Sequence, residues 1–409
     1  MPALGRNRSK RDVRRRAPRA LLFGLVLTTG AGAALCACNL LTGVASLERG
    51  TEDECIDGTE PACKGDKDAT TGDAKGDSHV DPTCGKDCLG GACAGGACQP
   101  VVLAMNQDRP VGIAVDDKRI YWANRGSVDA GNGTVQTSAL DGTDKRELVN
   151  KQPSAGFVAV DSTWVYLTDQ GTEQANFLDG RIVRIRKDGT AFDRIYDNQP
   201  APFGIAIDSA NVYWTNALNG EVFRARLDGT GTPALIAPAA PYTFGIAADE
   251  TAVFWTRFDP TDNLGEVYTA RPDGGARGAL ASNQATPRGI AIDATTVYWV
   301  NEDDDTVMSL PRTGLGTPKV LADRQDKPYT IVLDDKNVYW VNQGATDGTC
   351  SVMRIGKDGT CGAKGAGDAG GECPQVLASG QSRPYGIAVD KVAVYWVNFA
   401  SGNVLRVAK

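Results

Sequence analysis

The chain has 409 residues, with 42% hydrophobic residues, 48 glycines and 20 prolines, which is enough for one large domain or two medium-sized ones. Its net charge is −7, yet residues 1–37 hold eight Arg or Lys against one Asp, so the rest of the chain is strongly acidic. An acidic body excludes nucleic acid and anionic lipid surfaces as partners, because both require a cationic surface.

The chain begins with a pattern that indicates export. The basic head precedes an uncharged run, ALLFGLVLTTGAGAAL (20–35), which is short for a membrane span. The following LCAC (35–38) resembles a bacterial lipobox with Cys38 as the lipidated residue. We therefore expect a signal peptide over 1–37 and a lipid anchor in the bacterial envelope, with the outer membrane or cell surface favoured over the cytoplasmic membrane. The alternative is a soluble secreted protein.

Residues 38–98 form a Gly-, Asp- and Cys-rich segment. Stretches such as CKGDKDATTGDAKGD (63–77) have too few apolar residues to form a core, so the sequence predicts a flexible tether. An even number of cysteines in an exported chain favours disulfides over a zinc site, with a small knot at 84–100. Their pairing is not determined by the sequence; the candidates are Cys55, Cys63, Cys84, Cys88, Cys93 and Cys98.

Residues 99–409 contain seven repeats of a GIAVD…YWVN pattern. The motif aspartates recur at intervals of 41–56 residues, at Asp116, Asp161, Asp208, Asp249, Asp293, Asp334 and Asp390. Several short β-rich runs in each repeat of this length predict an all-β fold, a seven-bladed β-propeller with four-stranded blades. The last repeat ends after its third strand, so Val101–Ala104 should complete it in a 3+1 closure that removes exposed strand edges.

Three further cysteines lie among the repeats. Cys361 and Cys373 flank a glycine-rich insertion, GAKGAGDAGGE (362–372), and are predicted to form a disulfide that closes it into a loop. The remaining Cys350 has no partner that the sequence identifies.

The repeat pattern resembles known families. GIAVD, then YWxN, then LDGT is similar to the YWTD repeats of low-density-lipoprotein-receptor propellers and to exported bacterial propellers. The combination of lipobox, Cys-rich linker and propeller also resembles envelope lipoproteins of myxobacterial type. The resemblance implies a propeller over 99–409 and implies no activity. This chain departs from the YWTD pattern in its usual Asn at the fourth position and in having seven repeats instead of six.

Most repeated residues are interpreted as structural. The tryptophan of each repeat should fill the space between blades, and the motif aspartate should cap the turn after the first strand. The residue before each first strand instead varies, and Phe203, Phe244, Arg288, Tyr329 and Tyr385 should ring the mouth of the central channel. Two interpretations remain open: a ligand-binding surface, or a plug of aromatic side chains.

Catalytic and metal chemistry have few candidates. The only histidine, His79, lies in the tether, so the propeller offers no His-based triad, and the histidine-dependent activity of seven-bladed lyases is disfavoured. Asp303, Asp304 and Asp305 are the candidate ligands for calcium, with a solvated acidic loop as the alternative.

The leading function is a non-catalytic binding or scaffold module. It would recognise a protein, peptide or glycan at the face turned away from the membrane, and would touch the membrane through its lipid anchor only. No cofactor is expected apart from the candidate calcium. The alternatives are a calcium-dependent lactonase or other hydrolase that uses channel carboxylates, and a purely structural envelope component.

Overall fold

The computed structural model describes residues 80–81, 84–127, 130–238, 242–261, 264–346, 349–360 and 373–409. The predicted signal peptide and the sites at Cys38, Cys55, Cys63 and Cys361 lie outside these residues. The chain divides into two compact units, 1–52 and 53–409, and every described residue belongs to the second. Within that described part, no helix is long and apolar enough to cross a membrane.

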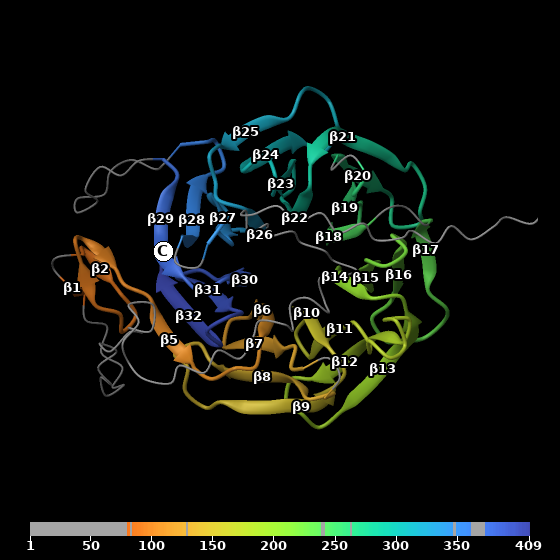
Figure 1. Ribbon diagram of the computed structural model, residues 1–409, viewed down its shortest axis with the longest axis horizontal. Helices are drawn as coiled ribbons and strands as arrows, with labels where there is room; N and C mark the ends of the chain where they lie inside the picture. Colours follow the sequence, from red (N-terminus) through yellow and green to blue (C-terminus); the bar gives the residue numbers. More distant parts are fainter. Residues whose placement is uncertain are drawn as a thin grey trace, which may run out of the picture. The chain divides into compact units, whose positions relative to one another are not determined.

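The propeller consists of seven four-stranded antiparallel sheets around a common centre (Figure 1). Blades 1–3 contain β6 (Pro110–Val115), β7 (Arg119–Asn124), β8 (Gly133–Ala139) and β9 (Arg146–Gln152); β10 (Ala155–Val160), β11 (Trp164–Asp169), β12 (Gly180–Arg186) and β13 (Phe192–Gln199); β14 (Pro202–Ile207), β15 (Asn211–Asn216), β16 (Val222–Arg226) and β17 (Ala234–Ala237). The all-β, seven-bladed prediction is confirmed.

Blades 4–7 follow the same order from the centre outward. They contain β18 (Thr243–Ala248), β19 (Val253–Asp259), β20 (Leu264–Ala270) and β21 (Gly278–Ala285); β22 (Pro287–Ile292), β23 (Thr296–Asn301), β24 (Thr306–Pro311) and β25 (Lys319–Ala322); β26 (Pro328–Leu333), β27 (Asn337–Asn342), β28 (Cys350–Gly356) and β29 (Gln375–Gln381); β30 (Pro384–Val389), β31 (Ala393–Asn398), β32 (Asn403–Ala408) and β5 (Val101–Ala104).

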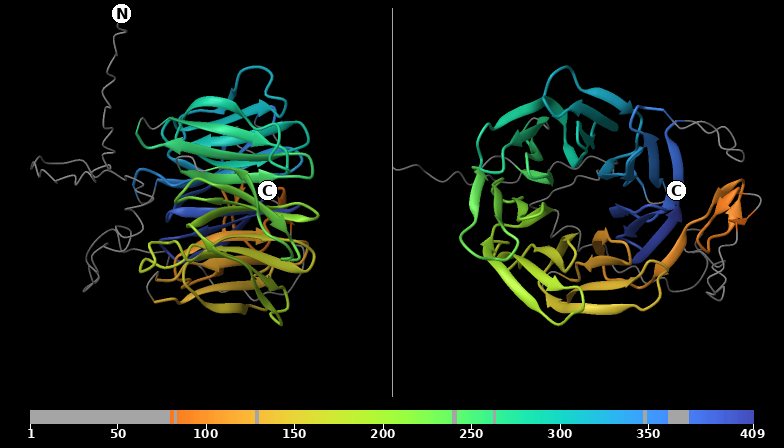
Figure 2. Two further views of the ribbon diagram at one scale, coloured as in Figure 1. Left: turned by 90° about the vertical axis from the view of Figure 1, so that its right-hand side faces the viewer. Right: turned by 180° about the vertical axis from the view of Figure 1, so that it is seen from behind.

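The ring closes through β5, as the sequence predicts. β5 pairs antiparallel with β32, with Val102 opposite Leu405 and Ala104 opposite Val404. Both front and back views place β5 on the outer edge of blade 7 (Figures 1 and 2). At the centre, β30 of blade 7 packs against β6 of blade 1, which leaves no gap between the last and first blades. Closure therefore joins strands from the two ends of the propeller sequence.

The glycine of the repeated motif is required by the close approach of neighbouring innermost strands. A Cβ on Gly204 would lie 2.3 Å from the carbonyl oxygen of Phe244 in the next blade, and one on Gly386 would lie 2.4 Å from that of Val111. Such separations are shorter than any tolerated contact, so a side chain here would push the blades apart.

Tryptophan, asparagine and an unpredicted glutamine connect successive blades. In blade 7, Gln381 Oε1 from the preceding blade accepts hydrogen bonds from Trp396 Nε1 (2.9 Å) and Asn398 Nδ2 (3.1 Å). The same arrangement occurs in four other blades, through Gln107, Gln199, Gln284 and Gln325. The six tryptophans in the motif position are 0–2% exposed, which confirms their structural interpretation.

Blade 2 departs from this scheme. Its tryptophan, Trp164, comes three positions early and lies only half-buried beneath the guanidinium of Arg184, 4.3 Å from the ring centroid. Buried Leu167 takes the usual tryptophan position. Asp169 replaces the asparagine and pairs with Arg181 at 2.8 Å. Burial raises the pKa of Asp169, although the nearby Arg181 charge opposes that shift.

The motif aspartates lie at one face of the ring, here called the Asp face, together with the turns after the third strands. In blade 7, Asp390 Oδ1 accepts the backbone N–H groups of Val392 (2.8 Å) and Ala393 (2.7 Å), and Oδ2 accepts the Tyr395 hydroxyl (2.9 Å). The predicted turn-capping role is confirmed. Four of these aspartates also pair with a cation from the next blade: Asp116 with Lys187, Asp249 with Arg312, Asp293 with Lys357 and Asp334 with Lys409.

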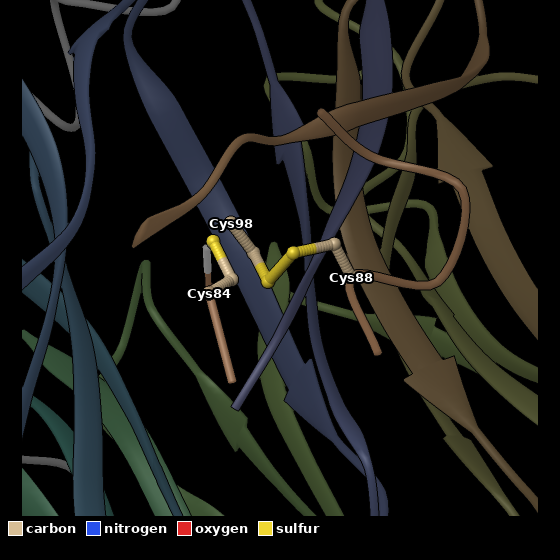
Figure 3. A group of neighbouring side chains, drawn as sticks. All are labelled: Cys84, Cys88 and Cys98. Carbon is tan, nitrogen blue, oxygen red and sulfur yellow. A yellow bond between two sulfur atoms is a disulfide. The ribbon is translucent and has the colours of Figure 1, made fainter. Parts of the chain in front are cut away.

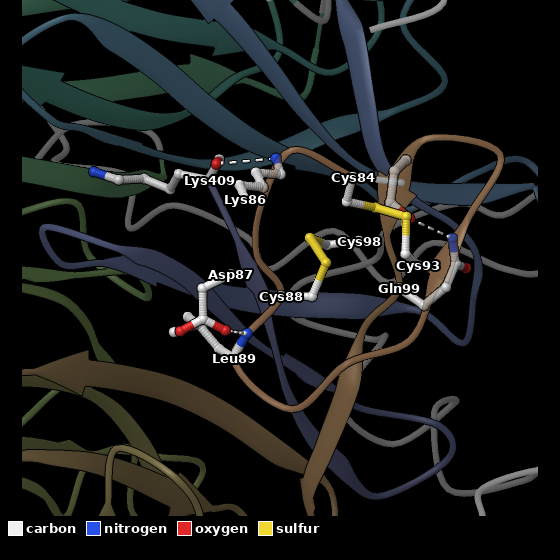
Figure 4. Close-up of a disulfide and its surroundings, with 10 residues drawn as sticks. Cys84, Lys86, Asp87, Cys88, Leu89, Cys93, Cys98, Gln99 and Lys409 are labelled. Carbon is white, nitrogen blue, oxygen red and sulfur yellow. Dashed lines mark hydrogen bonds between the residues drawn. A yellow bond between two sulfur atoms is a disulfide. The ribbon is translucent and has the colours of Figure 1, made fainter. Parts of the chain in front are cut away.

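A disulfide knot precedes the propeller. It contains the short strands β1 (Val80–Asp81), β2 (Lys86–Asp87), β3 (Cys93–Ala94) and β4 (Ala97–Cys98). Disulfides join Cys84 to Cys93 and Cys88 to Cys98 (Figure 4), which confirms the knot predicted at 84–100. Lys86 Nζ donates to the backbone oxygen of Lys409 (3.0 Å), and Arg406 donates to the carbonyl of Leu89, so the knot contacts the end of β32.

The sulfur atoms of this knot are already bonded. Cys84, Cys88 and Cys98 bring their sulfur atoms within 4.8 Å of one another (Figure 3), and they are the only metal-compatible group among the described residues. Since all three are in disulfides, their proximity is explained without a metal. Cys373 is also disulfide-bonded, whereas Cys350 Sγ lies buried, 2.7 Å from the carbonyl oxygen of Gln343.

Candidate binding face

The face opposite the Asp face is formed by the loops after the second strands and the links that enter the first strands. We call it the aromatic face. Each residue predicted to ring the channel mouth is the second residue of the first strand of its blade. The structure brings all five together. Their side chains are 1–9% exposed: Phe203, Phe244, Arg288, Tyr329 and Tyr385.

These side chains contact one another across the ring. The Phe203 and Phe244 centroids are 5.6 Å apart in an edge-to-face arrangement. Tyr329 and Tyr385 lie 4.7 Å apart, with their hydroxyl oxygens at 2.7 Å. Phe157, at the position where other blades have glycine, connects the two pairs at 4.9 Å from Phe203 and 6.0 Å from Tyr385. Mutual contact of this kind fits an aromatic plug, and both interpretations of the five residues stay predictions.

A cavity of about 220 Å³ lies beside the aromatic cluster. Its wall includes a ring of β-branched side chains, one from each blade, three residues before the motif aspartate: Ile113, Val158, Ile205, Ile246, Ile290, Ile331 and Ile387. Phe203, Phe244, Arg288 and Tyr329 line it as well. The centre of the propeller is therefore apolar, and Arg288 is the one charged side chain among the lining residues.

A second ring of side chains on this face escaped the sequence analysis. It is formed by the residue after each YWxN motif, and five of its members are buried while Gln343 and Phe399 are half-buried: Arg125, Gln170, Ala217, Phe258, Glu302, Gln343 and Phe399. Contacts join the two rings within a blade, as between Phe244 and Phe258 (5.4 Å) and between Tyr385 and Phe399 (5.8 Å). In the sequence, every member of this second ring lies nine residues after a motif aspartate.

One ion pair is buried between the two rings. Arg288 Nε donates to Glu302 Oε2 at 2.5 Å, and the two side chains are 3% and 8% exposed. The guanidinium also lies 4.2 Å from the Phe244 centroid and 5.7 Å from that of Tyr329. Within blade 5 the charge of Arg288 is therefore balanced by Glu302 and surrounded by aromatic rings.

The acidic loop predicted to hold calcium engages other partners. Asp303 accepts hydrogen bonds from Lys327 Nζ (2.8 Å) and from the Thr286 hydroxyl (2.5 Å). Burial raises the pKa of Asp303, but the hydrogen bonds from Lys327 and Thr286 outweigh it, so the net shift is downward. Asp305 accepts the Lys327 N–H, and Asp304 is exposed. These contacts give the loop a structural role, and calcium binding stays an untested prediction.

The similarity of this chain to known proteins is a similarity of fold. No family model and no curated protein matches the chain. Selenomethionine-substituted virginiamycin B lyase from Staphylococcus aureus superposes with a TM-score of 0.58 at 16% identity, covering 76% of this chain and 98% of the lyase. Its catalytically inactive H270A variant with quinupristin gives 0.57 at the same identity and coverage. A chain of a nidogen/laminin complex gives 0.48 at 21% identity, covering 68% and 97%. At these identities, the likeness to the lyase structures concerns the fold alone.

Proposed function

We propose that this protein is an exported, lipid-anchored propeller that binds a protein, peptide or glycan through its aromatic face. One observation carries the proposal: the two rings of this face differ from blade to blade, while the positions that join the blades repeat. The rings include four aromatic side chains at the channel mouth and the half-buried Phe399 beside them. Aromatic and arginine side chains of this kind dominate recognition surfaces.

The attachment of the knot supports an outward orientation of this face. Lys86 bonds to the backbone of Lys409, at the end of β32 on the Asp face. β5 runs antiparallel to β32, so the chain enters the propeller from the Asp face. A tether that leads from a lipidated Cys38 through the knot would therefore approach the Asp face, which leaves the aromatic face directed toward a partner.

Lyase chemistry is not part of the proposal. One lyase structure that superposes on this chain is the catalytically inactive H270A variant. Residues 99–409 of this chain contain no histidine. The shared fold is thus a scaffold on which different sites can be built.

Charge reversal on each face tests the proposal. Lys151 and Arg324 are exposed near the aromatic face, whereas Lys118 and Lys336 are exposed in turns of the Asp face. A tagged propeller is used for capture from envelope extract, with and without calcium. We expect Lys151→Glu with Arg324→Glu to reduce capture of the bound partner several-fold, and Lys118→Glu with Lys336→Glu to leave it unchanged. Equal losses for both pairs, or a loss only in the Asp-face pair, would contradict the proposal.

The anchor is tested separately. The wild-type protein should partition into the detergent phase, and Cys38→Ala should move it to the aqueous phase, because one lipidated residue supplies the membrane affinity. Cys36→Ala is the matched control and should leave the partition unchanged. Recovery of the wild-type protein only in the aqueous phase would remove the anchor from the proposal.

A further inference from the structure

We infer that the aromatic face contains a carboxylate-binding site, formed by Arg125 and Arg383 around Phe399 where blade 7 meets blade 1. The inference rests on the proposed function and deepens it, since it specifies the chemical group that a ligand of this face presents. It is carried by a buried cation whose charge the described residues do not balance.

Arg125 is buried and has no counter-ion among the described residues. Its residue is 5% exposed, and its Nε atom is buried and has no hydrogen-bond partner. No described carboxylate forms an ion pair with it; Asp108, in the adjacent link, accepts Asn132 Nδ2 instead (3.1 Å). Withdrawing a cation from water without an opposite charge is strongly unfavourable. A bound anion would offset that cost.

Arg383 brings a second cation to the same aromatic ring. The guanidinium carbons of Arg125 and Arg383 lie 6.0 Å and 5.5 Å from the Phe399 centroid. Arg383 is half-buried, with a positive φ of 53° and no ion pair to a described carboxylate. An anion bound beside Phe399 and in contact with both guanidinium groups would offset both positive charges.

The surrounding groups define the type of anion. Gln343, at the equivalent second-ring position of blade 6, also has a buried Nε2 with no partner among the described residues, so the second ring carries an unsatisfied donor in each of the two blades that flank blade 7. Donors without acceptors suit a ligand group that only accepts hydrogen bonds, and a guanidinium matches the two oxygens of a carboxylate. Tyr385 lies 5.8 Å from Phe399 and leads into the aromatic cluster. A carboxylate attached to an apolar or aromatic group therefore fits this site.

Three probes test the inference with the full chain. 3-Phenylpropionate is compared with the neutral 3-phenylpropionamide and with inorganic phosphate at constant ionic strength, by calorimetric titration and by thermal unfolding. We expect the carboxylate alone to bind and to raise the unfolding temperature. Arg125→Gln and Arg383→Gln should each weaken its binding at least tenfold. Arg277→Gln, at an exposed arginine in the turn between β20 and β21 on the Asp face, is the matched control and should bind as the wild type does.

Several outcomes would overturn the site. These are equal binding of acid and amide, phosphate binding in preference to the carboxylate, unchanged affinity in Arg125→Gln, and no carboxylate binding at about 10 mM. If Arg125→Gln does not fold, the carboxylate affinity of Arg383→Gln, whose substituted side chain is only half-buried, tests the site instead. Without ligand, Arg125→Gln should not lower the unfolding temperature, because it removes an uncompensated charge; a clear drop would assign Arg125 a structural role. The titration needs no captured partner, so its failure is distinct from failure of the capture experiment.

Discussion

The two faces of the propeller are built under different constraints. On the Asp face, the same aspartate caps the same turn in blade after blade, and cations from neighbouring blades pair with four of these aspartates. On the aromatic face, equivalent positions hold side chains as different as Ala217, Glu302 and Phe399. The contacts between blades must repeat for the ring to close. The side chains at the strand ends on the aromatic face do not make these repeated contacts, so their identity can vary. Variation there is available for recognition.

The largest expected effect follows from breaking the ring that supports both faces. Deleting residues 99–106 removes β5 and exposes the edge of β32, with its unpaired backbone groups and the apolar side chains beneath it. We expect aggregation or loss of the cooperative unfolding transition, measured by size-exclusion chromatography and circular dichroism. Deleting 64–71, an equal number of residues outside every described strand, controls for chain length. A monomeric, fully folded 99–106 deletion would refute the closure.

Substituting two glutamines compares the stability contributed by the contacts between blades with the stability contributed by the second ring of the aromatic face. Gln381→Leu leaves Trp396 Nε1 and Asn398 Nδ2 buried without an acceptor, and should cost about 2–4 kcal/mol of unfolding free energy. Gln343→Leu, on the aromatic face, removes an amide nitrogen that has no partner and should change stability by less than about 1 kcal/mol. Urea denaturation of both variants measures the difference. Equal costs would mean that the second ring is as structural as the scaffold.

A smaller effect concerns the pH dependence of the Asp face. Burial alone would raise the pKa of Asp293, but the Thr295 N–H and the Lys357 ammonium lower it from 3.8 to about 2. A depressed folded-state pKa contributes stability above the unfolded-state value, and this contribution is lost as pH falls from about 4 to about 2. Asp293→Asn should cost on the order of 1 kcal/mol at pH 7 and flatten the acid limb of a stability profile. An unchanged acid limb would show that Asp293 does not contribute to it.

Much of the scaffold could be predicted from sequence because it repeats. The motif aspartates, the tryptophans and the matching ends indicated seven blades and a 3+1 closure, all of which the structure has. The glutamine that bonds five of the six motif tryptophans also recurs, as in LASGQ and LASNQ, but its role depends on a neighbouring blade and was not recognised. The knot was predicted, whereas its pairing required three-dimensional proximity of Cys84 to Cys93 and of Cys88 to Cys98.

The sequence predicted the first ring of the candidate site and missed the second. The sequence identified five residues because they precede a motif, yet their mutual burial depends on contacts between neighbouring blades: Phe203, Phe244, Arg288, Tyr329 and Tyr385. The second ring carries no common residue type, and only its fixed distance from the aspartates marks it. Arg125 in particular cannot be distinguished from an ordinary surface arginine until its burial beside Phe399 is seen.

The most direct test of the aromatic face as the binding face is hydrogen exchange of the propeller alone and in its captured complex. We predict slower exchange in the loops after the second strands, including 169–180 and 302–305, with no change in the Asp-face turns at 141–143, 188–190 and 358–360. Protection confined to the Asp-face turns, with unchanged exchange in the loops of the aromatic face, would contradict the account.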